Sequence, residues 1–565
     1  MSSAPTLSVN ETSNDLLTQR ISSKFEWFVG AVVILGLVGI RIYFMSHAGG
    51  LWRDEVHSVD VARNHQFPLW QDSFPILWVT FLRAWIFVCG DSDDTSMRLA
   101  GLFWSLILLG TAVWAAQGRS RAVPWATLIL FGMSPIVTTY GTEVRGYAMG
   151  ASALFWMLGL MQRWLLRPTG RGGILLVIAS LVAVQAAYAN SFLLLAASLS
   201  AGILCVMEKR WRALLFLLAN GIVCAVTVSP YILVILPLLT GDWVVVLRQD
   251  FPVGRYVNQM MYSFGAGGVL PFLAWGVLAC CAGFGVKQRY YRRVEDEKST
   301  NTAPCGPPGA LEIMQLVFGT LLIIGYLKWL NVYSAEWYYL PVLALWAFCL
   351  DSMIATWTQR SASSSVRLGI AILLAASQIP ITWDAANVRL TNVDIVSKAV
   401  TEMATDKDLV IVSPWIYGIP VQRYYHGAAP WICIPKVSKT EVPGVMIHAD
   451  GYRAVMATMM SENPLAAELA QIRETLRRGG RVFVMGNVTM PQKGDIVLEM
   501  PVAPSSQYGW GYEAYRTLWT QKIGLELLAH SKEIRLLPIN NQQPVNRYED
   551  SQLYVVEGLL DDSVK

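Results

Sequence analysis

Up to about residue 390, the chain consists of long apolar blocks separated by short polar or basic linkers. A block of about twenty residues is long enough to cross the apolar core of a bilayer as a helix. The pattern therefore predicts a polytopic α-helical membrane protein with about eleven transmembrane helices. The predicted spans are Trp27–Met45, Met97–Ala116, Pro124–Tyr140, Tyr147–Leu166, Gly172–Ala189, Ser191–Met207, Ala213–Leu239, Phe264–Val286, Leu311–Trp329, Trp337–Thr356 and Leu368–Trp383.

A further apolar stretch, Phe74–Cys89, is shorter and carries Arg83. Both features are typical of a helix that lies in the membrane interface. If it stays on the outer surface, the short basic linkers all fall on the cytoplasmic side together with the N-terminus, as the positive-inside rule requires. If it crossed the membrane, Arg119 and Arg121 would move outside. We therefore predict an outer interfacial helix here.

After Trp383 the pattern changes, and on this topology the rest of the chain lies outside. Short strand-like runs alternate with helix-like stretches, which predicts a compact α/β domain. The strand-like runs are Leu409–Ser413, Trp431–Ile434, Arg481–Met485, Ile534–Pro538 and Leu553–Glu557, and the helix-like stretches are Pro464–Arg478 and Ala514–His530. The predicted organisation is a cytoplasmic tail (1–24), a transmembrane domain (25–389) with an outer active-site loop (46–96), and an extracytoplasmic α/β domain (390–565).

The composition excludes several classes of protein. Of the 565 residues, 54% are hydrophobic and 15% are charged, and the mean hydropathy of +0.41 excludes a water-soluble enzyme. The net charge is +4, but the basic residues form short clusters between apolar blocks, so nucleic acid is not an expected partner. The eight cysteines have neither the spacing of a zinc site nor that of a disulfide framework.

Two adjacent carboxylates, Asp54 and Glu55, lie in the outer loop just beyond the first predicted span. Adjacent side chains point in different directions, so one carboxylate can face a cavity at the membrane surface while the other orients it. Such a carboxylate can act as a base or a metal ligand. A solvated acidic turn explains the same residues equally well. His57 is either a metal ligand beside the acids or a surface histidine.

A second polar cluster, Glu143 and Arg145, falls between two apolar blocks, and the topology puts it on the same side as Asp54. An interfacial salt bridge with a helix cap would account for it. Arg41 and Lys328 stand within apolar blocks. A cation there is costly unless it snorkels to the surface or meets an anion such as a phosphate.

Together these motifs resemble those of the GT-C glycosyltransferases. The resemblance rests on Arg41, Trp52-Arg53-Asp54-Glu55, the Pro75-initiated stretch ending at Gly90, Arg98-Leu99-Ala100, and Ser134-Pro135 leading to Glu143-Val144-Arg145-Gly146-Tyr147. The members that it resembles most are bacterial relatives of the dolichyl-phosphate-mannose protein mannosyltransferases and of the lipid A aminoarabinose transferases. The family commonly has Ala and an aromatic residue after Asp-Glu, whereas Val56 and His57 follow here.

The resemblance implies a glycosyltransferase that moves a sugar from a polyprenyl-phosphate donor to an acceptor on the extracytoplasmic face, with membrane lipids around it. Asp54 would be the general base, and Glu55 would orient it. A single base implies inversion at the sugar. The donor's phosphate and sugar would be bound by Arg41, Glu143, Arg145, Tyr147, Arg255 and Lys328.

A divalent metal ion is the candidate cofactor, and Asp54, Glu55 and His57 would be its ligands. The acceptor, whether a glycan, a lipid or a protein, is not identified by the sequence. The resemblance also implies a location in the bacterial cytoplasmic (inner) membrane, with the C-terminal domain on the periplasmic or extracellular side.

Two other hypotheses belong to different classes of protein. A transporter, or a flippase for a lipid-linked sugar, would use the outer domain to bind a ligand. Such proteins usually show paired halves or broken helices at matching positions, and the sequence shows neither. The second hypothesis is a structural membrane subunit with an outer partner-binding domain. It does not explain why Asp54 and Glu143 are expected on the same face of the membrane.

Overall fold

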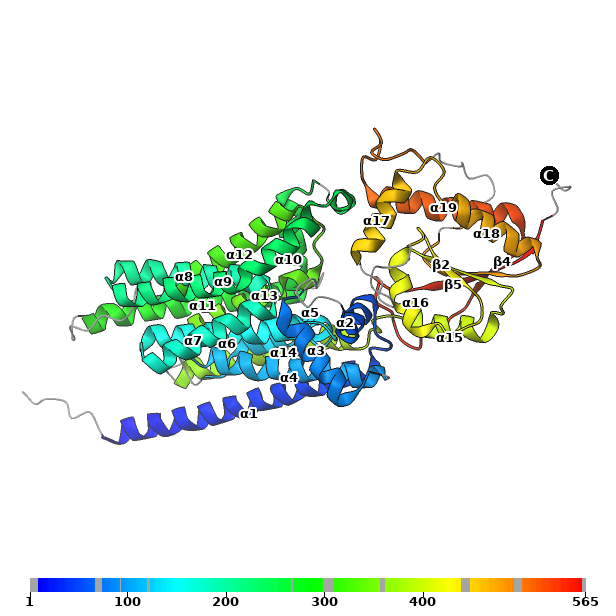
Figure 1. The fold of residues 1–565 in the computed structure, drawn as a ribbon. Coiled ribbons are helices and arrows are strands. Elements are labelled where there is room, and N and C mark those ends of the chain that lie inside the picture. Colours follow the sequence, from blue (N-terminus) through cyan, green and yellow to red (C-terminus); the bar gives the residue numbers. More distant parts are fainter. Residues whose placement is uncertain are drawn as a thin grey trace, which may run out of the picture.

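The computed structural model describes residues 9–66, 74–91, 93–118, 122–248, 250–265, 268–297, 309–355, 361–437, 448–488, 490–491 and 500–560. Long helices form a bundle, and a five-stranded sheet with its own helices forms a second part at one end of that bundle (Figure 1). The chain completes the bundle before it enters the sheet domain. This confirms the predicted fold class.

Within the described residues, eight helical segments are long and apolar enough to cross a membrane. They lie in α1 (Val9–His47), α4 (Asp94–Ala116), α8 (Ala189–Met207), α9 (Trp211–Thr240), α11 (Val269–Glu297), α12 (Ala310–Leu330), η4 with α13 (Glu336–Tyr339 and Leu340–Ile354) and α14 (Ser361–Ala386). Their outward side chains include Leu233 and Leu373, which are 79% and 72% exposed. Large apolar side chains that are this exposed on the helix surface suit contact with lipid.

The remaining predicted spans take other forms. Helix α6 (Tyr147–Leu166) has the predicted bounds and is buried along nearly its whole length inside the bundle. Helix α7 (Gly170–Ala186) has 17 residues, which is short for a span. Outside these, α10 (Val253–Gly265) and the short helix η3 (Asp242–Val246) connect α9 to α11.

The prediction of one continuous helix at Pro124–Tyr140 is wrong. The structure divides it into η2, a π-helix over Thr127–Gly132, and α5 (Pro135–Tyr140). Pro135 provides a physical reason, because the residue before a proline avoids the helical conformation. The buried carboxylate of Asp351 accepts two backbone N–H groups at the start of η2, at 2.9 and 2.7 Å. Broken backbone at membrane depth is tolerated where protein surrounds it.

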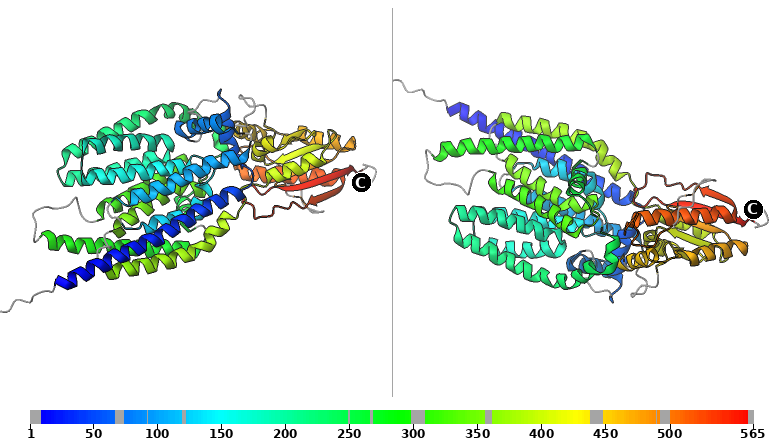
Figure 2. Two further views of the ribbon diagram at one scale, coloured as in Figure 1. Left: turned by 90° about the horizontal axis from the view of Figure 1, so that it is seen from below. Right: turned by 90° about the horizontal axis from the view of Figure 1, so that it is seen from above.

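Helices α2 (Arg53–Arg63) and α3 (Ile76–Cys89) lie at the end of the bundle that faces the sheet domain (Figures 1 and 2). At the exit from α1, Ala48 O accepts a hydrogen bond from Leu390 N at 2.9 Å. At the entry to α4, Asp94 pairs with Arg423 of the sheet domain at 2.7 Å. The chain therefore leaves and re-enters the bundle at the same end, and α3 does not cross it.

The C-terminal sheet has the order β2-β1-β3-β5-β4. The strands are β1 (Leu409–Ser413), β2 (Trp431–Cys433), β3 (Val482–Gly486), β4 (Ser531–Leu537) and β5 (Gln552–Leu559). Strands β2, β1 and β3 are parallel, and β5 runs antiparallel to β3 and β4. All five lie at positions that the sequence predicted. The helices are α15 (Val393–Met403), α16 (Gly418–Tyr424), α17 (His448–Met459), α18 (Ala466–Arg477) and α19 (Tyr512–His530), with the short η6 (Trp415–Tyr417).

Candidate functional site

Helix α2 carries Asp54 and Glu55 in its first turn. The first backbone N–H groups of a helix lack partners within it, so carboxylates there satisfy donors and meet the favourable end of the helix dipole. Glu55 Oε2 accepts the N–H of Trp52 at 3.1 Å. Both acids are buried, Glu55 completely and Asp54 to 8% exposure. They belong to a packed site and not to a solvated turn.

Glu55 joins three segments of the chain. Its Oε1 atom forms a buried ion pair with Arg98 of α4 and accepts the N–H of Val144 at 2.8 Å. Arg98 also donates to Gly50 O at 2.7 Å. Because both of its oxygens are held, Glu55 has the geometry of a residue that orients its neighbours.

Glu143 lies in the loop between α5 and α6 and is 1% exposed. Neither carboxyl oxygen has a hydrogen-bond partner among the described residues. Burial, and then the charges of Glu55 and Asp54, raise the pKa of Glu143 well above its usual range. Burial therefore favours the protonated form of the Glu143 carboxyl, and in that form it can donate a hydrogen bond into the site.

Arg145 is held directly beside Asp54. Its Nη1 atom donates to Asp54 O at 3.1 Å and to Ser58 Oγ at 2.8 Å. The guanidinium also lies over the rings of Phe74 and Tyr147, at 5.0 and 5.9 Å from their centroids. The loop before α6 thus brings a fixed cation to the first turn of α2. We call the group of Asp54, Glu55, Arg98, Glu143 and Arg145 the α2 site.

The side chain of Asp54 lies where the bundle meets the sheet domain. One of its oxygens is 3.3 Å from Nε of Arg53. Asp54 also interacts electrostatically with Tyr338 of η4 and with Tyr452 of α17. Both parts of the molecule therefore face the carboxylate proposed as the base.

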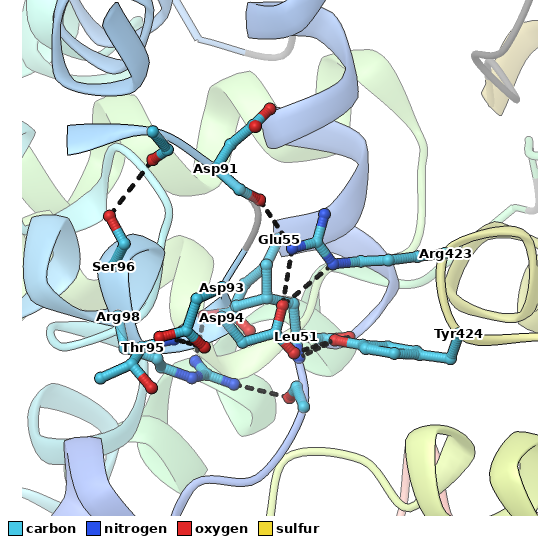
Figure 3. A network of polar contacts seen from close by, with 12 residues as sticks. Leu51, Glu55, Asp91, Asp93, Asp94, Thr95, Ser96, Arg98, Arg423 and Tyr424 are labelled. Carbon is cyan, nitrogen blue, oxygen red and sulfur yellow. Dashed lines mark hydrogen bonds and ion pairs between the residues drawn. The ribbon is translucent and has the colours of Figure 1, made fainter. Parts of the chain in front are cut away.

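The sheet domain also holds the chain on either side of α2 (Figure 3). Arg423 donates to Asp94 at 2.7 Å from Nη2 and at 3.0 Å from Nε. The Tyr424 hydroxyl donates to Asp94 Oδ2 at 2.7 Å and accepts the N–H of Leu51 at 2.5 Å. Figure 3 shows both side chains reaching from α16 toward the start of α4. These contacts fix the position of α2 relative to the sheet domain.

Arg41, a predicted donor-binding residue, lies deeper and does not snorkel. It is fully buried in α1. Its Nε donates to Ser105 Oγ at 3.0 Å, and its other nitrogens donate to Leu37 O and Gly132 O, both at 3.2 Å. Ser105 Oγ in turn is 3.1 Å from Thr142 Oγ1. Arg41 thus links α1 to α4 and η2. Through Ser105 it is also connected to Thr142, in the loop that precedes α6.

Lys328 and Arg255 belong to a second cationic group. Lys328 Nζ donates to Asp250 Oδ1 at 3.0 Å and to Phe251 O at 2.9 Å. Arg255 is exposed and lies over the rings of Phe251 and Tyr333, at 4.2 and 5.4 Å. The structure gathers Asp54, Glu55, Glu143, Arg145 and Tyr147 around α2, and Lys328 and Arg255 around Phe251. Because Asp250 balances the charge of Lys328, Arg255 is the more available cation of that group.

His57 is buried in α2 with 6% exposure. In the part of the chain that the structure describes, no group of three or more His, Cys, Asp and Glu side chains could hold a metal ion. Glu55 already has guanidinium and backbone partners on its oxygens. The metal set of Asp54, Glu55 and His57 stays a prediction.

Sequence reasoning assigned no role to three residues of this region. Arg53 and Arg98 were noted only as parts of motifs. Arg98 had a usable signal, because a cation in the first turn of an apolar block is costly without a partner. Glu549 had no local signal, since its contact with Arg53 spans 496 positions of the chain.

No protein-family model matches the sequence, and no curated protein matches it. Among solved structures, the chain is similar to ArnT from Cupriavidus metallidurans bound to undecaprenyl phosphate, with 11% identity, a TM-score of 0.46, and coverage of 81% of this chain and 92% of that chain. It is also similar to the archaeal oligosaccharyltransferase AglB from Archaeoglobus fulgidus in complex with an inhibitory peptide and a dolichol-phosphate. For AglB the identity is 13% and the TM-score 0.43, with coverage of 81% of this chain and 70% of that chain. Both are GT-C proteins, the superfamily that the motifs resemble. Identities and TM-scores this low leave the function to be inferred from the site itself.

Proposed function

We propose that the protein is a membrane glycosyltransferase that moves a sugar from a polyprenyl-phosphate donor to an acceptor, with Asp54 as the base. The observation that carries the proposal is the α2 site, where a buried carboxylate on a capped helix lies beside a fixed arginine. This transfer needs a base for the acceptor and positive charge for the leaving phosphate. Both must lie where lipid and water meet, and the end of the bundle is such a place.

In the proposed step, Asp54 takes the proton of an acceptor hydroxyl as that oxygen attacks the anomeric carbon. The bond from the anomeric carbon to the phosphate oxygen breaks on the opposite face, and its electron pair leaves with the polyprenyl phosphate. A single displacement of this kind inverts the sugar. Glu55 keeps Asp54 in place, because its own oxygens are occupied by Arg98 and two backbone N–H groups.

The leaving phosphate gains charge as the bond breaks, and fixed cations stabilise it. Arg145 suits this task, because its contacts with Asp54 O and Ser58 hold the guanidinium in one orientation. We assign Arg255 a second contact with the phosphate. Lys328 contributes less, since Asp250 already neutralises it.

The donor sugar would lie among the remaining predicted residues. A protonated Glu143 can donate to a sugar hydroxyl, and the ring of Tyr147 offers an apolar face. Arg41 would support the donor site indirectly, because its hydrogen bonds connect α1 to α4 and η2. A divalent ion is tested by chelation: loss of transfer with EDTA and recovery with Mg²⁺ or Mn²⁺ would support the metal set.

We place the protein in the bacterial cytoplasmic membrane, with the α2 site and the sheet domain on the periplasmic or extracellular side. The basic linkers of the sequence support this orientation. Labelling of single cysteines in intact cells with an impermeant reagent tests it. A cysteine at Glu533 in the sheet domain should be labelled from outside, and one at Ser120 should not.

A transfer assay tests the proposed reaction directly. Purified full-length protein is given a panel of polyprenyl-phosphate sugars and candidate acceptors, and the release of free polyprenyl phosphate is followed. Release together with an inverted product supports the glycosyltransferase. Movement of the lipid-linked sugar across proteoliposomes without release would favour the transporter or flippase.

A further inference from the structure

The loop between β4 and β5 extends from the sheet domain to the bundle. Its consecutive residues Arg547, Tyr548 and Glu549 contact two elements next to Asp54. The Tyr548 hydroxyl donates to Glu336 of η4 at 2.7 Å, and Arg547 donates to the same carboxylate at 3.4 Å. The loop therefore bridges the sheet domain and the outer end of the bundle.

Glu549 contacts the other element, α2. It is completely buried, and its two carboxyl oxygens lie 3.0 and 3.3 Å from the backbone N of Arg53, the first residue of α2. This N–H is one of those that a helix cannot satisfy internally. A carboxylate there also meets the positive end of the helix dipole. A side chain of the sheet domain thus caps the helix that carries Asp54.

Glu549 and Asp54 also share one cation. The guanidinium of Arg53 pairs with Asp54 at 3.3 Å, and the Glu549 carboxylate interacts with it electrostatically. Burial disfavours the charge of Arg53, but the charges of Asp54 and Glu549 outweigh burial and raise its pKa. Tyr452 and Tyr417 face the same guanidinium from α17 and η6.

We propose that Glu549 is a positioning residue for the transfer reaction, acting on Asp54 through Arg53 and through the N-terminus of α2. This inference rests on the function proposed above. It means that the helical bundle alone holds an incomplete site, which the sheet domain completes.

The consequence of losing Glu549 follows from its two contacts. Without the cap, the first turn of α2 loosens. Without the second carboxylate, Arg53 pairs with Asp54 alone, which favours the charged form of Asp54 and weakens it as a base. Both effects slow proton removal from the acceptor. Arg145 comes from the loop before α6 and is also held over the rings of Phe74 and Tyr147, which lie outside α2, so binding of the donor phosphate should change much less than kcat.

Hydrogen exchange measured by mass spectrometry tests the cap in the full-length protein without any substrate. In Glu549→Ala, the amides of a peptide covering residues 52–58 should exchange at least about tenfold faster than in the wild type. Glu533→Ala is the matched control, because Glu533 is an exposed acid of the same domain that pairs with Arg535. Unchanged exchange in Glu549→Ala would overturn the proposal.

Kinetics test the effect on the reaction. Glu549→Ala should lower kcat by about tenfold to a hundredfold with donor affinity within about twofold of the wild type. The kcat of Glu549→Gln should lie between those of Glu549→Ala and the wild type, because the glutamine amide oxygen still accepts an N–H. A normal kcat, or a loss of donor binding that matches the loss of kcat, would overturn the proposal. A wild-type protein that transfers no sugar would contradict the proposed function. The exchange measurement needs no substrate, so it still shows in that case whether Glu549 caps α2.

Discussion

The carboxylate of Glu55 and the guanidinium of Arg98 form a buried ion pair between the first turn of α2 and the start of α4. The same carboxylate accepts the N–H of Val144, so the loop before α6 joins the pair. One side chain thereby fixes three segments that are distant in sequence. Asp54, the residue before Glu55 in α2, takes its orientation from this junction.

Breaking this pair should be costly. In Arg98→Met, Glu55 stays buried without its counter-charge, and the free energy of unfolding should fall by about 3–5 kcal/mol. The double variant Glu55→Gln with Arg98→Met should recover much of that loss, because no charge is left uncompensated. Thermal unfolding in detergent measures both. Arg473→Met, which breaks the half-exposed pair with Glu526, is the matched control. A double variant less stable than Arg98→Met would argue against this account of the pair.

Glu143→Gln should have a small effect on turnover. Burial and the charges of Glu55 and Asp54 raise the pKa of the Glu143 carboxyl well above the usual range, which favours its protonated form. Glutamine has nearly the same shape as the protonated acid and also donates a hydrogen bond. We expect turnover within about fivefold of the wild type in the polyprenyl-phosphate release assay. A loss as large as that of Asp54→Asn would mean that Glu143 works as an ionised group.

Arg145→Lys should weaken donor binding by about tenfold or more, because lysine keeps the charge but loses the two-pronged geometry and the contacts with Ser58. Lys328→Gln is the comparison, and its effect should be small because Asp250 already balances Lys328. Binding of polyprenyl phosphate to the purified protein measures both. Wild-type affinity in Arg145→Ala would remove Arg145 from the phosphate site.

Much of the fold could be predicted from the sequence, because apolar block length and strand-like alternation are local signals. The five strands of the sheet domain were found in this way. The break after η2 was missed, because it depends on burial around Asp351 as well as on Pro135. A hydropathy pattern shows that a segment is apolar, and it does not show whether protein or lipid surrounds it.

The candidate site could be predicted in part. The predicted topology placed two segments at the same end of the bundle, the one with Asp54 and Glu55 and the one with Glu143 and Arg145. In the structure these four residues do lie together. Their hydrogen bonds could not be predicted. The partner of Glu55 is 43 positions away, and the cap of α2 comes from another domain. Contacts of this kind follow from tertiary packing, which leaves no periodic pattern in the chain.

In the proposed reaction, Asp54 takes the proton of the acceptor. Asp54→Asn keeps the size of the side chain and removes its ability to accept that proton. Purified Asp54→Asn protein should release polyprenyl phosphate about two to four orders of magnitude more slowly than the wild type, with donor binding retained. Asp406→Asn, a change at an exposed acid of the sheet domain, should be as active as the wild type. A folded Asp54→Asn protein that transfers sugar at the wild-type rate would contradict the claim and move the base to Glu143.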